Sequence, residues 1–303
     1  SRTVSVPYAL SLALAVADLR RQIAEARARE QIGEYQAARA MAVAATARAR
    51  TLAYPPVLAE ALYQRGRVEH ALGEGPRAAA SLEEAGALAE AVRHDHLKAE
   101  VWSRLVRVAS LDEDDPEQGQ AWARLARGAL ARVDERGAPL ADAIENEALA
   151  LHASSRFGEA LAGHREALQI RERVLGASHL KVADSLNNLA NTLGAEGQHA
   201  EALALYERAI ALQTEHLGPR HPDLAITLFN VALQAVELGR AARAEETLAL
   251  ARSIDLEVFG ADSRRMAQIH LATALLREQG GAYEAALGEA EAAVRVLGRQ
   301  VGE

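Results

Sequence analysis

The sequence predicts an all-α fold, an α-solenoid of about seven helical hairpins, and three observations support that prediction. Gly197, Gly239 and Gly281 recur at a spacing of forty-two residues, which is typical of stacked repeat proteins. Half of the chain is apolar but only 4% is aromatic, which favours closely packed helices over a sheet. At 303 residues a single core would be near its size limit, whereas an array grows by adding units.

The clearest unit is residues 179–218, which are predicted to form a helical hairpin. Apolar residues follow the three-and-four spacing of one helix face at 182–193 and again at 202–212. Gly197 lies between these helices, where a left-handed residue would close the first one. The small residues expected to let the two helix axes approach closely are Ala190, Ala202 and Ala209.

The same period, drifting to about forty residues upstream, predicts the other pairs of one continuous domain spanning residues 1–303. The predicted elements are an N-terminal pair at 7–52 hinged at Gly33, repeats at about 56–92, 95–133, 138–174, 180–216 and 222–258, and a C-terminal capping pair at 264–301. The end pairs are expected to depart from the pattern, because terminal repeats act as caps. The acidic run Asp112–Pro116 is the expected loop of altered length.

Composition narrows the classes of function. A formal net charge of -8 argues against a nucleic-acid partner held by overall charge, although a local basic patch stays open. Lys98 and Lys181 are the only lysines among 34 Lys and Arg residues, which reflects genome composition or else a use of guanidinium groups for carboxylate partners. With no cysteine there is no disulfide and no cysteine metal site, and a cytoplasmic setting fits.

The N-terminal apolar run from Val4 to Leu19 is interrupted by Pro7 and Asp18, so it predicts neither a signal peptide nor a membrane span. The chain does not begin with Met. We therefore expect it to be a piece of a longer protein, with Ser1 left by a tag.

The unit at 179–218 resembles the tetratricopeptide repeat. The residues that carry the resemblance are Leu186-Asn187-Asn188-Leu189-Ala190, Gly197, Glu201-Ala202 and Tyr206. The forty-two-residue form, with Leu217-Gly218-Pro219-Arg220-His221-Pro222-Asp223 between hairpins, is similar to the repeats of kinesin light chains. This resemblance implies a right-handed superhelix that binds an extended peptide or a partner protein on its concave face, without a cofactor.

A second likeness concerns residues Leu52–Ala61 followed by Gly66-Arg67, which resemble repeats found after the catalytic domain of bacterial serine/threonine kinases. The sequence holds no Gly-rich phosphate loop and no Asp-Phe-Gly triplet, so this piece contains no kinase domain. The resemblance implies the docking or regulatory region of a signalling kinase.

Carrying the family's groove positions onto the first helix of each pair gives the candidate partner-binding residues. They are Gln64, Arg67, Arg104, Arg107, Asn146, Asn187, Asn188, Asn191, Phe229, Asn230, Leu233 and Leu271. Five of them occupy the same place in successive units, namely Gln64, Arg104, Asn146, Asn188 and Asn230. Amide side chains both donate and accept hydrogen bonds, which suits an extended peptide backbone. The alternative is that these amides bridge adjacent helices or face solvent.

The charged and apolar candidates also leave two interpretations open. The arginines would clasp a carboxylate or phosphate, or else pair with Glu60 and Glu100 on a solvated surface. Phe229, Leu233 and Leu271 predict an apolar anchor pocket, or else packing beneath a C-terminal cap.

Residue clusters that suggest catalysis or metal binding have simpler explanations. His94-Asp95-His96 with Glu100 is the one compact metal-like cluster, but His94 and Asp95 better suit a loop and a helix cap. His179 and His221 recur before successive hairpins and are predicted to start helices. Ser154-Ser155 lies at the hinge where later repeats have glycine.

We therefore expect a non-catalytic interaction scaffold without metal or cofactor. Two alternatives stay open: a ligand-gated sensor of a peptide or small molecule that regulates an attached domain, and a module that self-associates through its C-terminal end.

Overall fold

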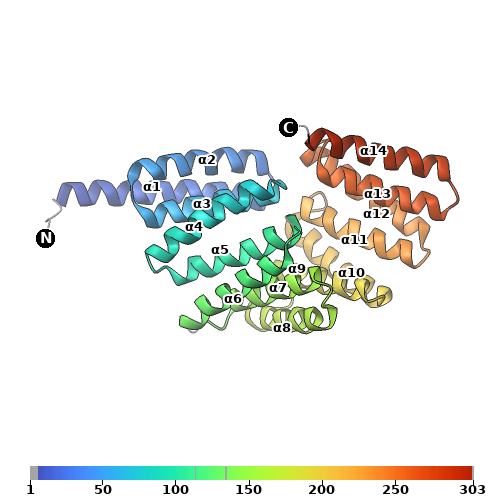
Figure 1. Cartoon of the computed structure of the whole chain (residues 1–303), viewed down its shortest axis with the longest axis horizontal. Coiled ribbons are helices and arrows are strands. Elements are labelled where there is room, and N and C mark those ends of the chain that lie inside the picture. The colour runs from blue at the N-terminus through green and yellow to red at the C-terminus, as the bar shows by residue number, and fades with distance from the viewer. Residues whose placement is uncertain (1–5, 113, 134, 302–303) are drawn as a thin grey trace. The chain divides into compact units, whose positions relative to one another are not determined.

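The computed structural model describes residues 6–112, 114–133 and 135–301. Within these ranges the chain consists of fourteen α-helices and one π-helical turn, without a strand, so the predicted all-α fold is confirmed (Figure 1). Ser1, Val4 and Glu113, to which the expectations above refer, lie outside the described residues.

Contacts between Cα atoms divide the chain into two compact units, residues 1–163 and 164–303. The helices of unit 1 are α1 (Val6–Gln31), α2 (Tyr35–Leu52), α3 (Pro55–Ala71), α4 (Gly75–Ala91), α5 (Asp95–Arg107) with the π-helical turn η1 (Val108–Asp112), α6 (Pro116–Arg132) and α7 (Ala138–Ala153). The unit boundary falls within α8 (Phe157–Leu175). The helices of unit 2 are α9 (Leu180–Ala195), α10 (His199–Leu217), α11 (Pro222–Glu237), α12 (Ala241–Phe259), α13 (Arg264–Gln279) and α14 (Tyr283–Val301). That the two units form one continuous solenoid stays a prediction.

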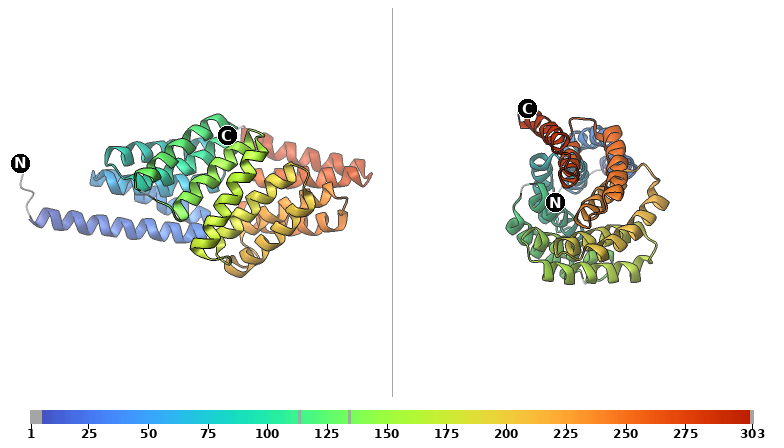
Figure 2. Two further views of the ribbon diagram at one scale, coloured as in Figure 1. Left: turned by 90° about the horizontal axis from the view of Figure 1, so that it is seen from below. Right: turned by 90° about the vertical axis from the view of Figure 1, so that its right-hand side faces the viewer.

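Within each unit, consecutive helices pack side by side as hairpins (Figures 1 and 2). In unit 1, α1 packs on α2, α3 on α4 and α5 on α6, and in unit 2, α9 packs on α10, α11 on α12 and α13 on α14. The small residues expected between α9 and α10, Ala190, Ala202 and Ala209, are fully buried. Their burial lets the two backbones approach closely, because no long side chain separates them.

The turns inside the hairpins use left-handed backbone, as the repeated glycines predict. Gly197 has φ 79°, a conformation that glycine adopts without a steric penalty. Ser155 takes φ 58° at the equivalent turn between α7 and α8, so it fills the place of a repeat glycine in a strained conformation. This placement agrees with a structural role for Ser155.

Three histidines start helices, as the sequence predicts. His179 Nδ1 accepts a hydrogen bond from the Lys181 N–H, and His221 Nδ1 accepts one from the Asp223 N–H, both at 3.1 Å. His94 Nδ1 accepts from the N–H of Leu97 at 3.2 Å. Each ring therefore caps the free N–H groups of a helix start.

The predicted irregular connection lies between α5 and α6. The first helix of this pair continues through η1 as far as Asp112. Asp114 then adopts a left-handed conformation with φ 53°. The Asp115 carboxylate caps α6 by accepting a hydrogen bond from the N–H of Gln118 at 3.0 Å. Because a π-helical turn is wider than an α-turn, it absorbs the change in length at this repeat.

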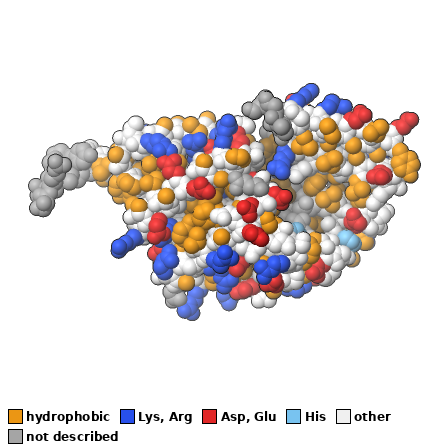
Figure 3. Space-filling view, in the orientation of Figure 1, with side chains coloured by type: hydrophobic (Ala, Val, Ile, Leu, Met, Phe, Trp, Pro, Cys, Tyr) orange, Lys and Arg blue, Asp and Glu red, His pale blue; other side chains and the backbone are white. Residues whose placement is uncertain are grey.

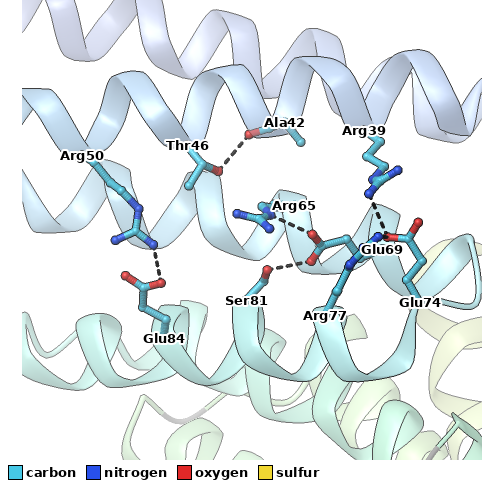
Figure 4. Close-up of polar contacts among 10 residues, drawn as sticks. All are labelled: Arg39, Ala42, Thr46, Arg50, Arg65, Glu69, Glu74, Arg77, Ser81 and Glu84. Carbon is cyan, nitrogen blue, oxygen red and sulfur yellow. Dashed lines mark hydrogen bonds and ion pairs between the residues drawn. The ribbon is translucent and has the colours of Figure 1, made fainter. Parts of the chain in front are cut away.

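Arginine–carboxylate pairs connect neighbouring hairpins in unit 1 (Figure 4). Arg50 of α2 pairs with Glu84 of α4. Inside the second hairpin the carboxylate of Glu69, 1% exposed, accepts hydrogen bonds from Arg65 Nε at 2.7 Å and from Ser81 Oγ at 2.6 Å. These partners satisfy a buried charge that would otherwise destabilise the hairpin.

None of the helices within the described ranges combines the length and the apolar character needed to cross a bilayer.

Candidate functional site

In both units the first helices of successive hairpins approach one another, whereas the second helices do not. In unit 2, α9 contacts α11 and α11 contacts α13, and in unit 1, α1 contacts α3 and α3 contacts α5. Comparable contacts between α10 and α12, or between α2 and α4, are absent from the described part of the chain. Because the first helices lie closer together, their exposed side is the inner, concave side of each unit.

Four asparagines gather on this side of unit 2. Asn187, Asn188 and Asn191 share a face of α9 by helical spacing, and all three are half-buried. Asn230 Nδ2 of α11 donates a hydrogen bond to Asn187 Oδ1 at 3.2 Å. One amide can form up to four hydrogen bonds, so this single bond fixes both amides while leaving donor and acceptor capacity. Asn187 and Asn230 thus bridge α9 and α11, as one alternative expected, and their amides can still form hydrogen bonds with a ligand.

Neighbouring polar contacts hold these amides in place. Asn191 Oδ1 accepts a hydrogen bond from the hydroxyl of Tyr206 on α10, and the Tyr206 side chain is fully buried. One turn beyond Asn230, Gln234 Oε1 lies 2.7 Å from His199 Nδ1. A Cβ at Gly194 would approach Gln234 Oε1 to 2.5 Å, so the Gln234 amide lies directly against the backbone of α9, and a side chain at 194 would displace it.

The apolar candidates of unit 2 divide into two groups. Phe229 and Leu233 are half-buried and pack against a core that includes Met266 and Ile269 of α13. This packing corresponds to the alternative in which they lie beneath the C-terminal hairpin. Leu271 of α13 is exposed at 49% and remains available to a partner.

Gln64 and Arg67 of unit 1 are engaged inside the molecule. Gln64, 2% exposed, donates through Nε2 to Glu30 Oε2 at 2.6 Å, and Arg67 Nη2 donates to Glu30 Oε1 at 2.9 Å. Glu60, the alternative partner expected for this arginine, accepts hydrogen bonds from Arg20 of α1 instead. One carboxylate of the first hairpin therefore neutralises Arg67 and holds Gln64.

Arg104 and Arg107 lie on α5 near the half-buried His70. His70 Nδ1 is 2.9 Å from Asp112 Oδ2, and burial, together with the charges of Arg104 and Arg107, lowers the pKa of His70 against the effect of Asp112. Arg104 is half-buried, and within the described residues no acceptor lies at hydrogen-bonding or ion-pair distance from its guanidinium. Arg104 is the member of this group that keeps its capacity for an anion.

Asn146 of α7 is 9% exposed, so the structure places it in the interior of unit 1. The His94-Asp95-His96 segment is used structurally, with His94 as a cap and Asp95 bonded to Lys98 and Arg132. Over the ranges described, no three His, Asp or Glu side chains converge as a metal site requires.

Three residues that shape the site were not predicted from the sequence, namely Glu30, Gln234 and His199. Glu30 neutralises Arg67 from a hairpin where the repeat pattern is weakest, so no spacing pointed to it. Gln234 and His199 form their contact between α11 and the start of α10. The sequence signal that could have indicated this contact is that Gln234 is an amide one helical turn after Asn230 and therefore lies on the same face of α11.

The comparisons with known proteins agree with this architecture. The family model described as tetratricopeptide repeat matches residues 140–215 and 183–257. These residues are tetratricopeptide repeats. The matched range contains the four gathered asparagines of unit 2, Asn187, Asn188, Asn191 and Asn230, and also Asn146 of unit 1.

Solved structures extend the likeness over most of the chain. The Rap conjugation gene regulator of plasmid pLS20, in complex with the Phr* peptide, is 14% identical, covers 93% of this chain and 74% of its own, with TM-score 0.72. A Rap protein complexed with competence and sporulation factor is 14% identical over 95% of this chain and 99% of its own, with TM-score 0.64. BtubC (BKLC) from P. vanneervenii is 23% identical over 80% of this chain and 92% of its own, with TM-score 0.52. At these identities the likeness concerns the fold, and no curated protein matches the sequence.

Proposed function

We propose that this chain is a non-catalytic docking module that binds an extended peptide segment of a partner protein across α9 and α11. The observation that carries the proposal is the hydrogen bond between Asn187 and Asn230, which orients two amides on the concave side of unit 2. A peptide laid across them would find donors and acceptors for backbone groups that lose water on binding. Because amides address the backbone, affinity would depend more on an extended conformation than on charged side chains.

The fold relatives support a peptide ligand. Two structures of similar fold hold, by their descriptions, the Phr* peptide and competence and sporulation factor. The concave side of α9 and α11 offers amides beside exposed Ile226, a surface suited to the backbone and the apolar side chains of an extended peptide.

The larger context of the proposal is bacterial signalling. The resemblance of Leu52–Ala61 and Gly66-Arg67 to repeats of bacterial serine/threonine kinases supports a docking or regulatory region of such a kinase, acting in the cytoplasm. Recovery of the parent gene tests this part separately, because it predicts a kinase domain encoded upstream.

The test of peptide binding begins with a random peptide library panned against the purified chain. Calorimetry then compares the affinity of a selected peptide for the original chain and for the Asn187→Ala and Asn230→Ala variants. Removal of one hydrogen bond to a neutral group is expected to weaken binding about 2- to 12-fold. Gln198→Ala, an exposed amide in the turn before α10, is the matched control and should bind like the original chain. Equal affinity of all four proteins would reject α9 and α11 as the binding surface.

A second candidate function, self-association, is favoured by the outer face of α14. Tyr283, Leu287 and Val294 are exposed at 71%, 62% and 67%, and Figure 3 shows apolar side chains gathered over the α13–α14 hairpin. The preceding second helix, α12, is covered by α13. An exposed apolar stripe of this kind is typical of a contact surface.

Sedimentation velocity over a range of concentrations tests this candidate. Self-association predicts a sedimentation coefficient that rises with concentration and loses that rise in Leu287→Glu. Ala285→Glu places the same charge at another exposed position of α14 and should leave the rise intact. A coefficient independent of concentration in the original chain would exclude self-association.

A further inference from the structure

Unit 1 contains a cavity of about 510 Å³ that the peptide-binding proposal does not use. Its walls come from the end of α4, the α4–α5 turn, α5 and α6. Within the described residues, the second helices α4 and α6 make no extensive contact with each other, and both line the cavity together with α5.

The cavity lies on a different side of α5 from the candidate peptide-binding residues. Lys98 and Trp102 line it, whereas Glu100 and Arg104 each follow two residues later. Two residues correspond to about 200° around a helix, so the two pairs point in nearly opposite directions. The cavity is therefore separate from the concave face.

A buried cation forms the floor. The side chain of Lys98 is only 4% exposed, and its Nζ lies 2.7 Å from Glu90 Oε2, 2.8 Å from Asp95 Oδ1 and 5.8 Å from the centre of the Trp102 ring. Arg132 Nη2 also donates to Asp95 Oδ1, at 2.8 Å. Hydrogen bonds from Lys98 and Arg132 lower the pKa of Asp95 to about 2, so this carboxylate stays charged at neutral pH and holds both cations.

Positive charge exceeds negative charge around the cavity. Glu90 and Asp95 are its carboxylates, and both are occupied by Lys98. Arg93 and Arg124 line the rim, and within the described ranges neither guanidinium has an acceptor at hydrogen-bonding distance. Two guanidinium groups thus remain for an anion, which they would meet in planar, bidentate geometry.

An apolar surface stands beside these cations. Trp102 is half-buried, and a Cβ at Gly86 would lie 3.5 Å from its Nε1, so the ring rests against α4. Leu125 of α6 is exposed at 45%. Gly128 contributes open space, because a Cβ there would meet only Arg132 Nη1, at 4.0 Å. The volume beside the indole can therefore admit a planar ring.

We propose that this cavity is a second ligand site, specific for a small molecule that joins a planar apolar ring to one phosphate or carboxylate group. The ring would lie between Trp102 and Leu125, and the anionic group would bind Arg93 and Arg124 at the rim. The proposal is independent of peptide binding, because it uses neither α9 nor α11.

The chain contains two tryptophans, so a Trp122→Phe variant leaves Trp102 as the only indole reporter. Phenyl phosphate and phenylacetate distinguish the two anionic groups, while inorganic phosphate and benzyl alcohol supply the anion and the ring separately. We expect a saturable change in Trp102 fluorescence with at least one of the two ring-bearing anions. Inorganic phosphate and benzyl alcohol should each bind at least about tenfold more weakly.

Variants of the rim test the assignment of the anion. Arg93 has φ 56°, a conformation that glycine adopts freely, so Arg93→Gly removes the guanidinium without straining the fold. Arg93→Gly combined with Arg124→Ala should weaken binding at least about tenfold. Arg127→Ala is the control, because Arg127 lies on α6 but pairs with Glu147 of α7 at 2.6 Å and does not line the cavity.

Three results would overturn the proposal. The first is the absence of saturable binding of either ring-bearing anion up to about 10 mM, a concentration at which even a weak site is occupied. The second is unchanged affinity in the double rim variant, and the third is equal binding of inorganic phosphate, which would remove the role of the ring. Failure here leaves the peptide-binding proposal untouched, because the calorimetric variants of α9 and α11 test that proposal alone.

Discussion

The contact between Tyr206 and Asn191 predicts an unequal pair of substitutions. The Tyr206 hydroxyl donates to Asn191 Oδ1 from a fully buried ring, whereas Asn191 is half-buried. In Tyr206→Phe the released amide oxygen can turn to water, so the loss is that of one neutral hydrogen bond, about 1 kcal/mol of unfolding free energy. In Asn191→Ala the buried hydroxyl loses its acceptor without access to water, which costs about 1–3 kcal/mol.

The double variant separates this contact from other effects. Once the hydroxyl is absent, Asn191→Ala no longer strands a buried donor. The loss of unfolding free energy in the double variant should therefore be about 1 kcal/mol smaller than the sum of the two single losses. Urea unfolding followed by circular dichroism measures the three variants. Because repeat arrays can unfold unit by unit, amide hydrogen exchange of α9 and α10 is measured in parallel. Strictly additive losses, or Tyr206→Phe as the costlier single change, would show that the hydrogen bond does not hold this hairpin together.

Three further predictions concern stability. Ala53 ends α2 in a left-handed conformation with φ 51°, so Ala53→Gly should raise the unfolding free energy by about 0.5–1 kcal/mol. Ala44→Gly, at an exposed position inside α2, should lower it by a similar amount. Shifts of the urea midpoint in the same direction for both variants would contradict this prediction. Burial raises the pKa of Tyr206 and of Tyr63, so the folded chain keeps protons that the unfolded chain loses above pH about 10. The unfolding free energy should therefore fall as the pH rises past that value, by up to about 1.4 kcal/mol per pH unit for each tyrosine. Tyr206→Phe should reduce this slope in urea unfolding measured over the same pH range. Glu69→Ala removes the acceptor of a buried hydroxyl and of an arginine, with an expected loss of about 1–3 kcal/mol in thermal or urea unfolding, and a loss near zero would mean that water replaces the carboxylate.

The sequence predicted the fold well because period and helix spacing are local properties. The recurrence of Gly197, Gly239 and Gly281 marks turns that need left-handed backbone, and all three adopt it. His179 and His221 were placed correctly as helix starts for the same reason, since a cap involves only residues two positions apart.

The candidate site was less predictable, because its details depend on contacts between hairpins. Arg67 was expected to pair with Glu60 or a ligand, but Glu30, 37 positions before it, reaches it from the first hairpin. The burial of Phe229 depends on how α13 packs over α11, which the pattern of one repeat does not contain. The cavity of unit 1 is lined by residues of two neighbouring hairpins, from α4, α5 and α6. The sequence of one repeat does not show how these hairpins pack, so it could not predict the cavity.

The central claim, that a peptide binds the concave side of α9 and α11, can be tested by placing a label either on a first helix, α11, or on a second helix, α10, of unit 2. The chain has no cysteine, so a single Ile226→Cys or Ala204→Cys carries an environment-sensitive fluorophore at one defined position. Ile226 is exposed on α11 one turn before Asn230, and Ala204 is exposed on α10. Titration with a peptide selected by panning should change the emission at 226, saturating at the calorimetric dissociation constant, and leave the label at 204 unaffected. A response at 204 with none at 226 would contradict the account.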